Sequence, residues 1–242
     1  MKLRILWMYH NIMDLYGDHG NIQVLKRRCQ KRHIEVIVDT CAIGETKSMK
    51  KYDLLFIGGG ADHEQRLLHK DLLQRKTDIL QANQEGMFIL LVCGGFQFFG
   101  QYYIDATGKK MEGLKFFDYY TQNNQEVGRC IGNIVIEANL DGEIMEVVGF
   151  ENHGGQTKNV KTPFGKVIKG HGNIFQGEYE GFYNGKVLAT YIHGPLLPKN
   201  PKVADFVIRK ALVRNYGNVE LIALDDTLEY QAQKIMIQRT CS

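Results

Sequence analysis

The sequence lacks the marks of several protein classes. It has four prolines in 242 residues and no tract rich in proline, glycine or serine that would mark a linker. No stretch approaches the roughly 18 consecutive apolar residues that a membrane-spanning helix needs. The five cysteines form no Cys-x-x-Cys pair, which argues against a disulfide scaffold and a structural zinc site. This cysteine usage fits a reducing cytoplasm.

An excess of charge of one sign is missing as well. The 30 lysines and arginines and the 27 aspartates and glutamates give a formal net charge of +3, which does not call for nucleic acid as a partner. Hydrophobic residues make up 44% of the chain, which excludes wholesale disorder. The apolar start turns polar at His10, so we interpret it as a core strand and not as a signal peptide. We expect one compact domain over residues 1–242.

Short apolar runs alternate with amphipathic segments in the first half. The predicted strands lie at 3–9, 34–38, 54–57 and 87–92, and the predicted helices at 22–32 and 62–85. Apolar runs without polar alternation are typical of strands buried on both faces of a sheet. The alternation of strands and helices predicts a doubly wound, mostly parallel α/β sheet.

The second half has a different pattern, with strand-like segments separated by glycine and asparagine turns. These segments lie at 131–137, 144–151, 166–169 and 187–192. They predict a mixed or antiparallel extension of the sheet. Two helices are expected after it, at about 202–216 and 226–238.

The predicted strand at 87–92 runs directly into Cys93, two glycines and an apolar helix. Ligands bind at the carboxyl ends of strands in open α/β sheets, and a nucleophile on a tight strand-to-helix turn is the arrangement of a nucleophile elbow. The N-terminus of a helix favours a thiolate and offers N–H groups to an oxyanion. Cys93 is therefore a candidate nucleophile, and the alternative is a buried cysteine whose glycines serve packing only.

A second strand end carries Gly58, Gly59 and Gly60, where the backbone can approach a ligand closely. A phosphate cradle is one interpretation, but no Gly-Lys step is followed by serine or threonine, so a self-contained ATP site is disfavoured. An oxyanion hole completed by Gly94 is another, and a plain tight turn is the third. His193 and His153 also follow apolar strands and are the candidate bases.

Five short motifs in this order resemble class I, triad-type glutamine amidotransferases of the branch found in cobyric acid synthases. They are Leu15–Ile22, Ile57–Asp62, Cys93–Phe98, Phe150–Gly155 and His193–Asn200. A stand-alone chain of this length is most similar to the glutaminase subunits of bacterial lipid II isoglutaminyl synthases. The resemblance runs from about Tyr9 to the C-terminus.

The resemblance implies a role for each candidate residue. Cys93 would be the nucleophile and His193 its base, with an oxyanion hole formed by Gly59 or Gly60 together with Gly94. Arg129 would grip the α-carboxylate of L-glutamine, since a guanidinium binds a carboxylate in a bidentate manner. Gln97 and His153 would line the substrate pocket, although a structural role is open for both.

The resemblance also implies partners. Ammonia would pass to a Mur-ligase-like subunit of the MurT type, which would amidate the D-isoglutamyl residue of the peptidoglycan stem peptide. ATP and magnesium would bind that partner, and this chain would hold no cofactor and no metal. We expect no membrane span, although contact with lipid II could bring the chain to the membrane surface.

One departure concerns the acid that orients the histidine. Typical class I members carry His-x-Glu, whereas here the sequence reads His193-Gly194-Pro195. We hypothesise that the orienting group is Glu151, Asp18 or a residue of the partner. Three other functions stay open: a glutaminase for a different amide ligase, a cysteine peptidase or γ-glutamyl hydrolase on a similar fold, and a catalytically silent scaffold.

Overall fold

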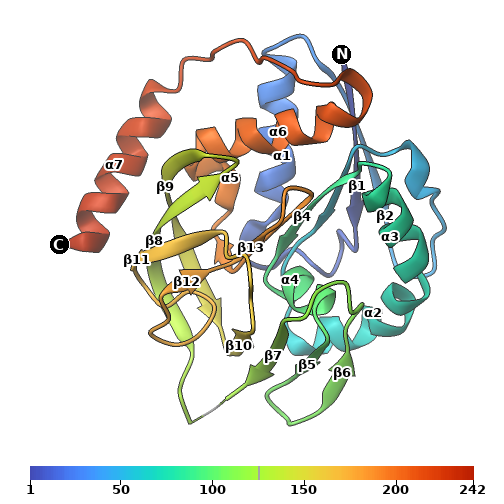
Figure 1. Ribbon diagram of the computed structural model, residues 1–242, viewed down its shortest axis with the longest axis vertical. Helices are drawn as coiled ribbons and strands as arrows, with labels where there is room; N and C mark the ends of the chain where they lie inside the picture. Colours follow the sequence, from blue (N-terminus) through green and yellow to red (C-terminus); the bar gives the residue numbers. More distant parts are fainter. Residues whose placement is uncertain (125) are drawn as a thin grey trace.

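A six-stranded sheet forms the centre of the computed structural model, which describes residues 1–124 and 126–242 (Figure 1). Its order is β13-β14-β4-β3-β1-β2. The strands are β1 (Lys2–Met8), β2 (Glu35–Cys41), β3 (Leu54–Ile57), β4 (Phe88–Val92), β13 (Phe182–Tyr183) and β14 (Val187–Thr190). All neighbours pair in parallel except β13, which is antiparallel to β14. The predicted mostly parallel sheet is confirmed.

Burial explains the apolar runs of the sequence. Every residue of β3, β4 and β14 is buried, so these strands have no polar face. The surrounding helices are α1 (His19–Gln30), α2 (Asp62–Gln74), α3 (Lys76–Gln84), α4 (Gly94–Phe99) and α6 (Pro201–Tyr216). Helix α4 packs on β4 and β14, and α6 packs on β1 and β4. Two single-turn 3₁₀ helices lie at Leu15–Gly17 and Met49–Lys51.

The helix expected at 62–85 is in fact two helices that meet at Arg75. The backbone N–H of Arg75 bonds to Leu72 O, and α2 ends at Gln74. The Arg75 guanidinium donates two hydrogen bonds to the carboxylate of Asp71 in the last turn of α2. Leu72 and Ile79 stay buried on either side of it, so the apolar period continues across the break and conceals it in the sequence.

The second half forms two further sheets. One has the order β10-β7-β5-β6, with β5 (Tyr102–Ile104), β6 (Lys110–Glu112), β7 (Tyr120–Asn123) and β10 (Gly155–Lys158). The other has the order β12-β11-β8-β9-β15, with β8 (Cys130–Leu140), β9 (Glu143–His153), β11 (Gly165–Lys169), β12 (Tyr179–Glu180) and β15 (Ile192–His193). The expected strands exist. Among the described residues, β13 is the one strand that extends the parallel sheet in the antiparallel sense.

The strand expected at 187–192 is divided between two sheets. It pairs with β4 as far as Thr190, and after Tyr191 it pairs with β9, where His193 lies opposite Phe150. This crossing places His193 where the parallel sheet and the antiparallel sheet meet.

The C-terminal segment crosses the molecule and ends in α7 (Thr227–Cys241), at the left edge of Figure 1. Arg28 of α1 bonds to both Asp205 of α6 and Asp226, and Arg32 bonds to Asp205 and to Ile222 O. These bonds fix the start of the segment. Helix α7 has no fully buried residue, and Leu228 is 76% exposed.

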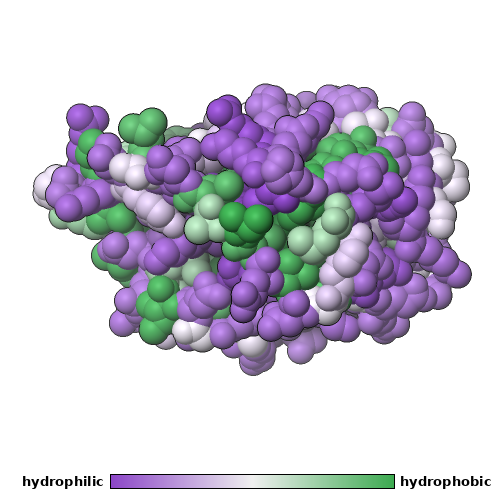
Figure 2. All heavy atoms as spheres, turned by 90° about the horizontal axis from the view of Figure 1, so that it is seen from above, coloured by the Kyte–Doolittle hydropathy of each residue, from purple (hydrophilic) through white to green (hydrophobic). Residues whose placement is uncertain are grey.

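Figure 2 shows hydrophobic patches among a mostly polar surface on the upper face. In the parts of the chain that the structure describes, no helix is long and apolar enough to cross a membrane.

Candidate active site

Three strand ends meet at one edge of the parallel sheet, because the carboxyl ends of parallel strands lie together. Cys93 follows β4, the glycines at 58–60 follow β3, and His193 comes shortly after β14. Cys93 is the N-cap of α4 and has φ +48° and ψ −102°, a strained conformation for a residue with a side chain. Its side chain lines a cavity although the residue is only 5% exposed. This is the geometry of a nucleophile elbow.

Cys93 and His193 face each other across Gly59. A Cβ atom added at Gly59 would lie 2.6 Å from His193 Cε1 and 3.2 Å from Cys93 Cβ. The position therefore needs glycine because both side chains occupy the space around it. The predicted pair of Cys93 and His193 is brought together, although 100 positions separate the two residues in the sequence.

Asp18 lies directly behind His193. Its Oδ1 is 3.2 Å from His193 Nδ1, and its Oδ2 accepts a hydrogen bond of 2.7 Å from Gly59 N. Asp18 and His193 are both fully buried. Burial lowers the pKa of His193, but the charges of Asp18 and Cys93 outweigh burial and raise it to about 10. A proton on Nδ1 that is held by Asp18 leaves Nε2 for exchange with the nucleophile or the substrate.

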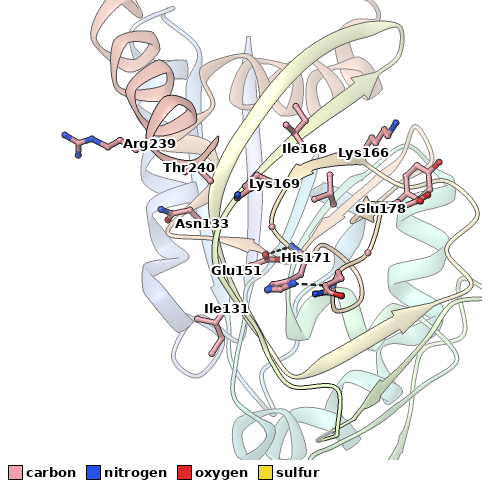
Figure 3. Close-up of a pocket in the computed structure, with 15 residues that line it drawn as sticks. Ile131, Asn133, Glu151, Lys166, Ile168, Lys169, His171, Glu178, Arg239 and Thr240 are labelled. Carbon is pink, nitrogen blue, oxygen red and sulfur yellow. Dashed lines mark hydrogen bonds between the residues drawn. The ribbon is translucent and has the colours of Figure 1, made fainter. Parts of the chain in front are cut away.

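Glu151, the other internal candidate for the acid, points elsewhere. Its two oxygens accept hydrogen bonds from the backbone N–H groups of His171 and Gly172. It lines a second cavity of about 790 Å³, and Figure 3 shows its hydrogen bond with the backbone of His171. Burial raises the pKa of Glu151 to about 7. The structure thus brings Asp18, and not Glu151, to His193.

The candidate oxyanion donors are not equivalent. The N–H of Gly59 is already bonded to Asp18. The described residues provide no hydrogen-bond acceptor for the N–H of Gly60 or of Gly94. A Cβ at Gly95 would lie 2.6 Å from Ile57 O, so the turn packs tightly against β3. Gly60 and Gly94 are the donors that the geometry leaves available.

The cavity beside Cys93 has a volume of about 410 Å³. Gln97, Arg129 and His153 all line it, as their predicted role as substrate-binding residues requires. Gln97 is held in place from both ends, because its Oε1 accepts from Gln65 and its Nε2 donates to Tyr191. Arg129 is exposed at the cavity, and its Nη2 donates to Asn152 Oδ1 at 2.8 Å.

His153 is neutral in this setting. Its ring stacks on Tyr191 with centroids 3.7 Å apart, and Nδ1 bonds to Gly155 O at 2.7 Å. Burial lowers the pKa of His153 to about 3. His153 therefore offers the cavity an uncharged ring and no catalytic proton.

Sequence reasoning missed several residues of the cavity wall. Tyr16 packs edge-on against the His193 ring at 5.1 Å and accepts a hydrogen bond from Asn152. Asp62 and Tyr103 line the cavity as well. Tyr16 has φ +58°, and the adjacent glycine was the sequence signal for a turn there. Asp62 comes two positions after Gly60 and ends the Ile57–Asp62 motif, but no role was assigned to it from the sequence.

Within residues 1–124 and 126–242, no three His, Cys, Asp or Glu side chains are grouped so that they could hold a metal ion.

Comparisons with known proteins show the family to which the chain belongs. The model of the CobB/CobQ-like glutamine amidotransferase domain matches residues 4–201, and the chain belongs to this family. The chain is 40% identical over 237 residues to the lipid II isoglutaminyl synthase (glutamine-hydrolysing) subunit GatD of Staphylococcus aureus (strain N315). That match covers 97% of this chain and 96% of GatD. The GatD subunit of Streptococcus pneumoniae (strain ATCC BAA-255 / R6) is 38% identical, with 95% and 88% covered. The sequence-based assignment to this family, and to glutamine-hydrolysing enzymes, is confirmed.

Two further similarities are more distant. A probable cobyric acid synthase of Methanocaldococcus jannaschii is 30% identical over 172 residues, covering 65% of this chain and 34% of that protein. A chain in the structure of PurLQS from Thermotoga maritima superposes with a TM-score of 0.58 at 14% identity, covering 88% of this chain and 98% of that one. The second similarity shows a shared fold.

Proposed function

We propose that this chain is the glutaminase subunit of a lipid II isoglutaminyl synthase. The observation that carries the proposal is the convergence of Cys93, His193 and Asp18 around Gly59 at the sheet edge. The near full-length similarity to two GatD subunits supports the particular enzyme. We also propose that residues 1–242 act as a single glutamine amidotransferase domain in the cytoplasm.

The reaction begins with attack of the Cys93 thiolate on the side-chain carboxamide carbon of L-glutamine. The N–H groups of Gly60 and Gly94 stabilise the oxyanion that forms. His193, as imidazolium, protonates the leaving nitrogen, and ammonia departs. The product of this step is a γ-glutamyl thioester on Cys93.

Water then hydrolyses the thioester, with neutral His193 as the base that takes its proton. Glutamate leaves and the thiolate is restored. Asp18 fixes the Nδ1–H tautomer of His193 and stabilises its charged form, which is the role of the acid in a triad. Because Oδ2 of the same carboxylate accepts a hydrogen bond from Gly59 N, Asp18 also holds the loop that carries Gly60 in position.

Substrate contacts come from the cavity wall. Arg129 binds the α-carboxylate, and Gln97 and His153 shape the pocket around the side chain of glutamine. Ammonia passes to a Mur-ligase-like partner of the MurT type that binds ATP and magnesium. The partner amidates the D-isoglutamyl residue of the lipid II stem peptide, and this chain holds no cofactor.

The test is glutamate release from L-glutamine by the purified chain, with and without a Mur-ligase-like partner. Cys93→Ala removes the nucleophile, and Cys29→Ala removes another buried thiol as the matched control. We expect activity that needs Cys93, tolerates loss of Cys29 and rises with the partner. Absence of Cys93-dependent glutamate under both conditions overturns the proposal.

A further inference from the structure

The cavity beside Cys93 contains two opposite charges that have no ionic partner. Asp62, the first residue of α2, and Arg129, just before β8, both line it. In the described chain, neither forms an ion pair with a protein side chain, whereas Asp105 nearby is paired with Arg66. A cavity lined by one carboxylate and one guanidinium without ionic partners among the described residues is matched to a ligand that carries both an ammonium and a carboxylate.

The carboxylate of Asp62 is held in place by neutral donors. Tyr103 donates its hydroxyl to Oδ1 at 2.7 Å, and Ala106 donates its N–H to Oδ2 at 3.2 Å. Tyr103 itself lines the cavity and is buried. These contacts fix the orientation of the carboxylate, and neither donor carries a full positive charge.

The position of Asp62 at the start of helix α2 matters for binding a zwitterionic ligand. The N-terminus of a helix carries a partial positive charge, so it attracts a carboxylate and repels an ammonium. Asp62 lies at this N-terminus and offsets the field locally. With Asp62 present, the α2 side of the cavity attracts an ammonium and Arg129 attracts a carboxylate.

We infer that Asp62 binds the α-ammonium of the substrate and restricts the enzyme to free glutamine. This inference rests on the proposed glutaminase function and assigns the group that selects its substrate. A glutamine whose amino group is acylated or lies in a peptide carries no ammonium. Binding it would leave the Asp62 carboxylate desolvated without a charged partner, and sites of this kind reject such analogues strongly.

The experiment compares glutamine with glutaramate, which has the same carboxamide chain and carboxylate but no α-amino group. Steady-state glutamate or glutarate release is measured for the wild-type chain, Asp62→Asn and Glu64→Gln. Glu64 is the matched control because it is acidic, lies in the same first turn of α2 and does not line the Cys93 cavity. Thermal melting curves of all variants verify folding.

We expect Asp62→Asn to raise KM for glutamine about 10- to 100-fold with kcat within about threefold, the effect of losing a hydrogen bond to a charged group. Its kcat/KM for glutaramate stays at the wild-type value or rises, so the preference for glutamine disappears. Glu64→Gln keeps the wild-type preference. If Asp62→Asn impairs both substrates equally, or leaves the preference intact, the inference is wrong.

Two further readouts separate the possible failures. If the wild-type chain releases no Cys93-dependent glutamate, the proposed function fails before Asp62 is tested. If Asp62→Asn does not fold, Tyr103→Phe provides the second variant, because it keeps the charge and removes one donor that orients it. We expect Tyr103→Phe to lower the preference for glutamine over glutaramate by a few-fold. An unchanged preference in Tyr103→Phe would then count against the inference.

Discussion

Replacing Asp18 with asparagine tests the centre of the proposed mechanism. The substitution keeps the shape of the side chain and removes its charge. It takes away the largest favourable contribution to the high pKa of His193, so burial dominates and that pKa falls. The asparagine can also present its NH₂ group to His193 Nδ1, which would favour the wrong tautomer.

The expected magnitude follows from the two roles of Asp18. General acid–base catalysis contributes about 10²- to 10⁴-fold to a rate, or about 3–5 kcal/mol of barrier. A thiolate depends less on its base than a hydroxyl does, so the first half-reaction retains more activity than the second. We therefore expect kcat to fall about 10²- to 10⁴-fold and the acyl-enzyme to accumulate.

The assay is the pH profile of kcat/KM for glutamine. In the wild-type chain, His193 keeps its proton up to a pKa of about 10, so activity that needs the imidazolium is lost only as the pH rises through that value. In Asp18→Asn the alkaline limb moves to lower pH because the imidazolium is no longer stabilised. An unchanged alkaline limb together with a kcat within threefold of wild type would refute the role of Asp18.

Three other substitutions test the packing at Gly59 and the stability of the fold. Gly59→Ala puts a methyl group 2.6 Å from His193 Cε1, so we expect at least about a 100-fold loss of kcat/KM with folding retained by circular dichroism. Arg28→Ala leaves the buried carboxylate of Asp226 unpaired, so we expect the free energy of unfolding in denaturant titrations to fall by about 3–5 kcal/mol. Arg27→Ala, on the exposed face of the same helix, is the control and should leave it unchanged. Burial raises the pKa of Glu180 to about 8. The unfolded chain loses this proton at a lower pH than the folded chain, so the free energy of unfolding decreases as the pH rises from about 5 to 8. Glu180→Gln should remove this part of the dependence of Tm on pH.

The elements that the sequence predicted well are those whose burial is uniform. The runs at 54–57 and 88–92 have no polar residue because helices and sheet bury both faces, so their positions follow directly from composition. The break at Arg75 could not be predicted, because Leu72 and Ile79 keep the apolar period across it. The division of the second half into two sheets depends on pairings between distant segments, such as β5 with β7 and β15 with β9.

The same contrast holds for the site. The closeness of Cys93 and His193 could be predicted because each follows an apolar strand, and strand ends share one edge. Asp18 was one of three options because it is 175 positions away from its partner in the sequence. It precedes α1 and does not lie in a strand. No local pattern near His193 indicates which carboxylate reaches it, and only the packing of α1 beside the sheet edge decides this.

The position of Asp18 bears on whether a partner subunit has to supply the acid that orients His193. In a His-x-Glu arrangement the acid lies two residues from the histidine, and the site is complete within one segment. Here position 195 is proline, and the carboxylate comes from the opposite end of the same chain, where it also binds the Gly59 N–H. A partner subunit therefore need not supply an acid to orient His193. If the partner accelerates hydrolysis, it does so through another step, and its addition should not rescue Asp18→Asn. Rescue to near wild-type rates would show instead that the partner provides the orienting group and that the contact between Asp18 and His193 is structural.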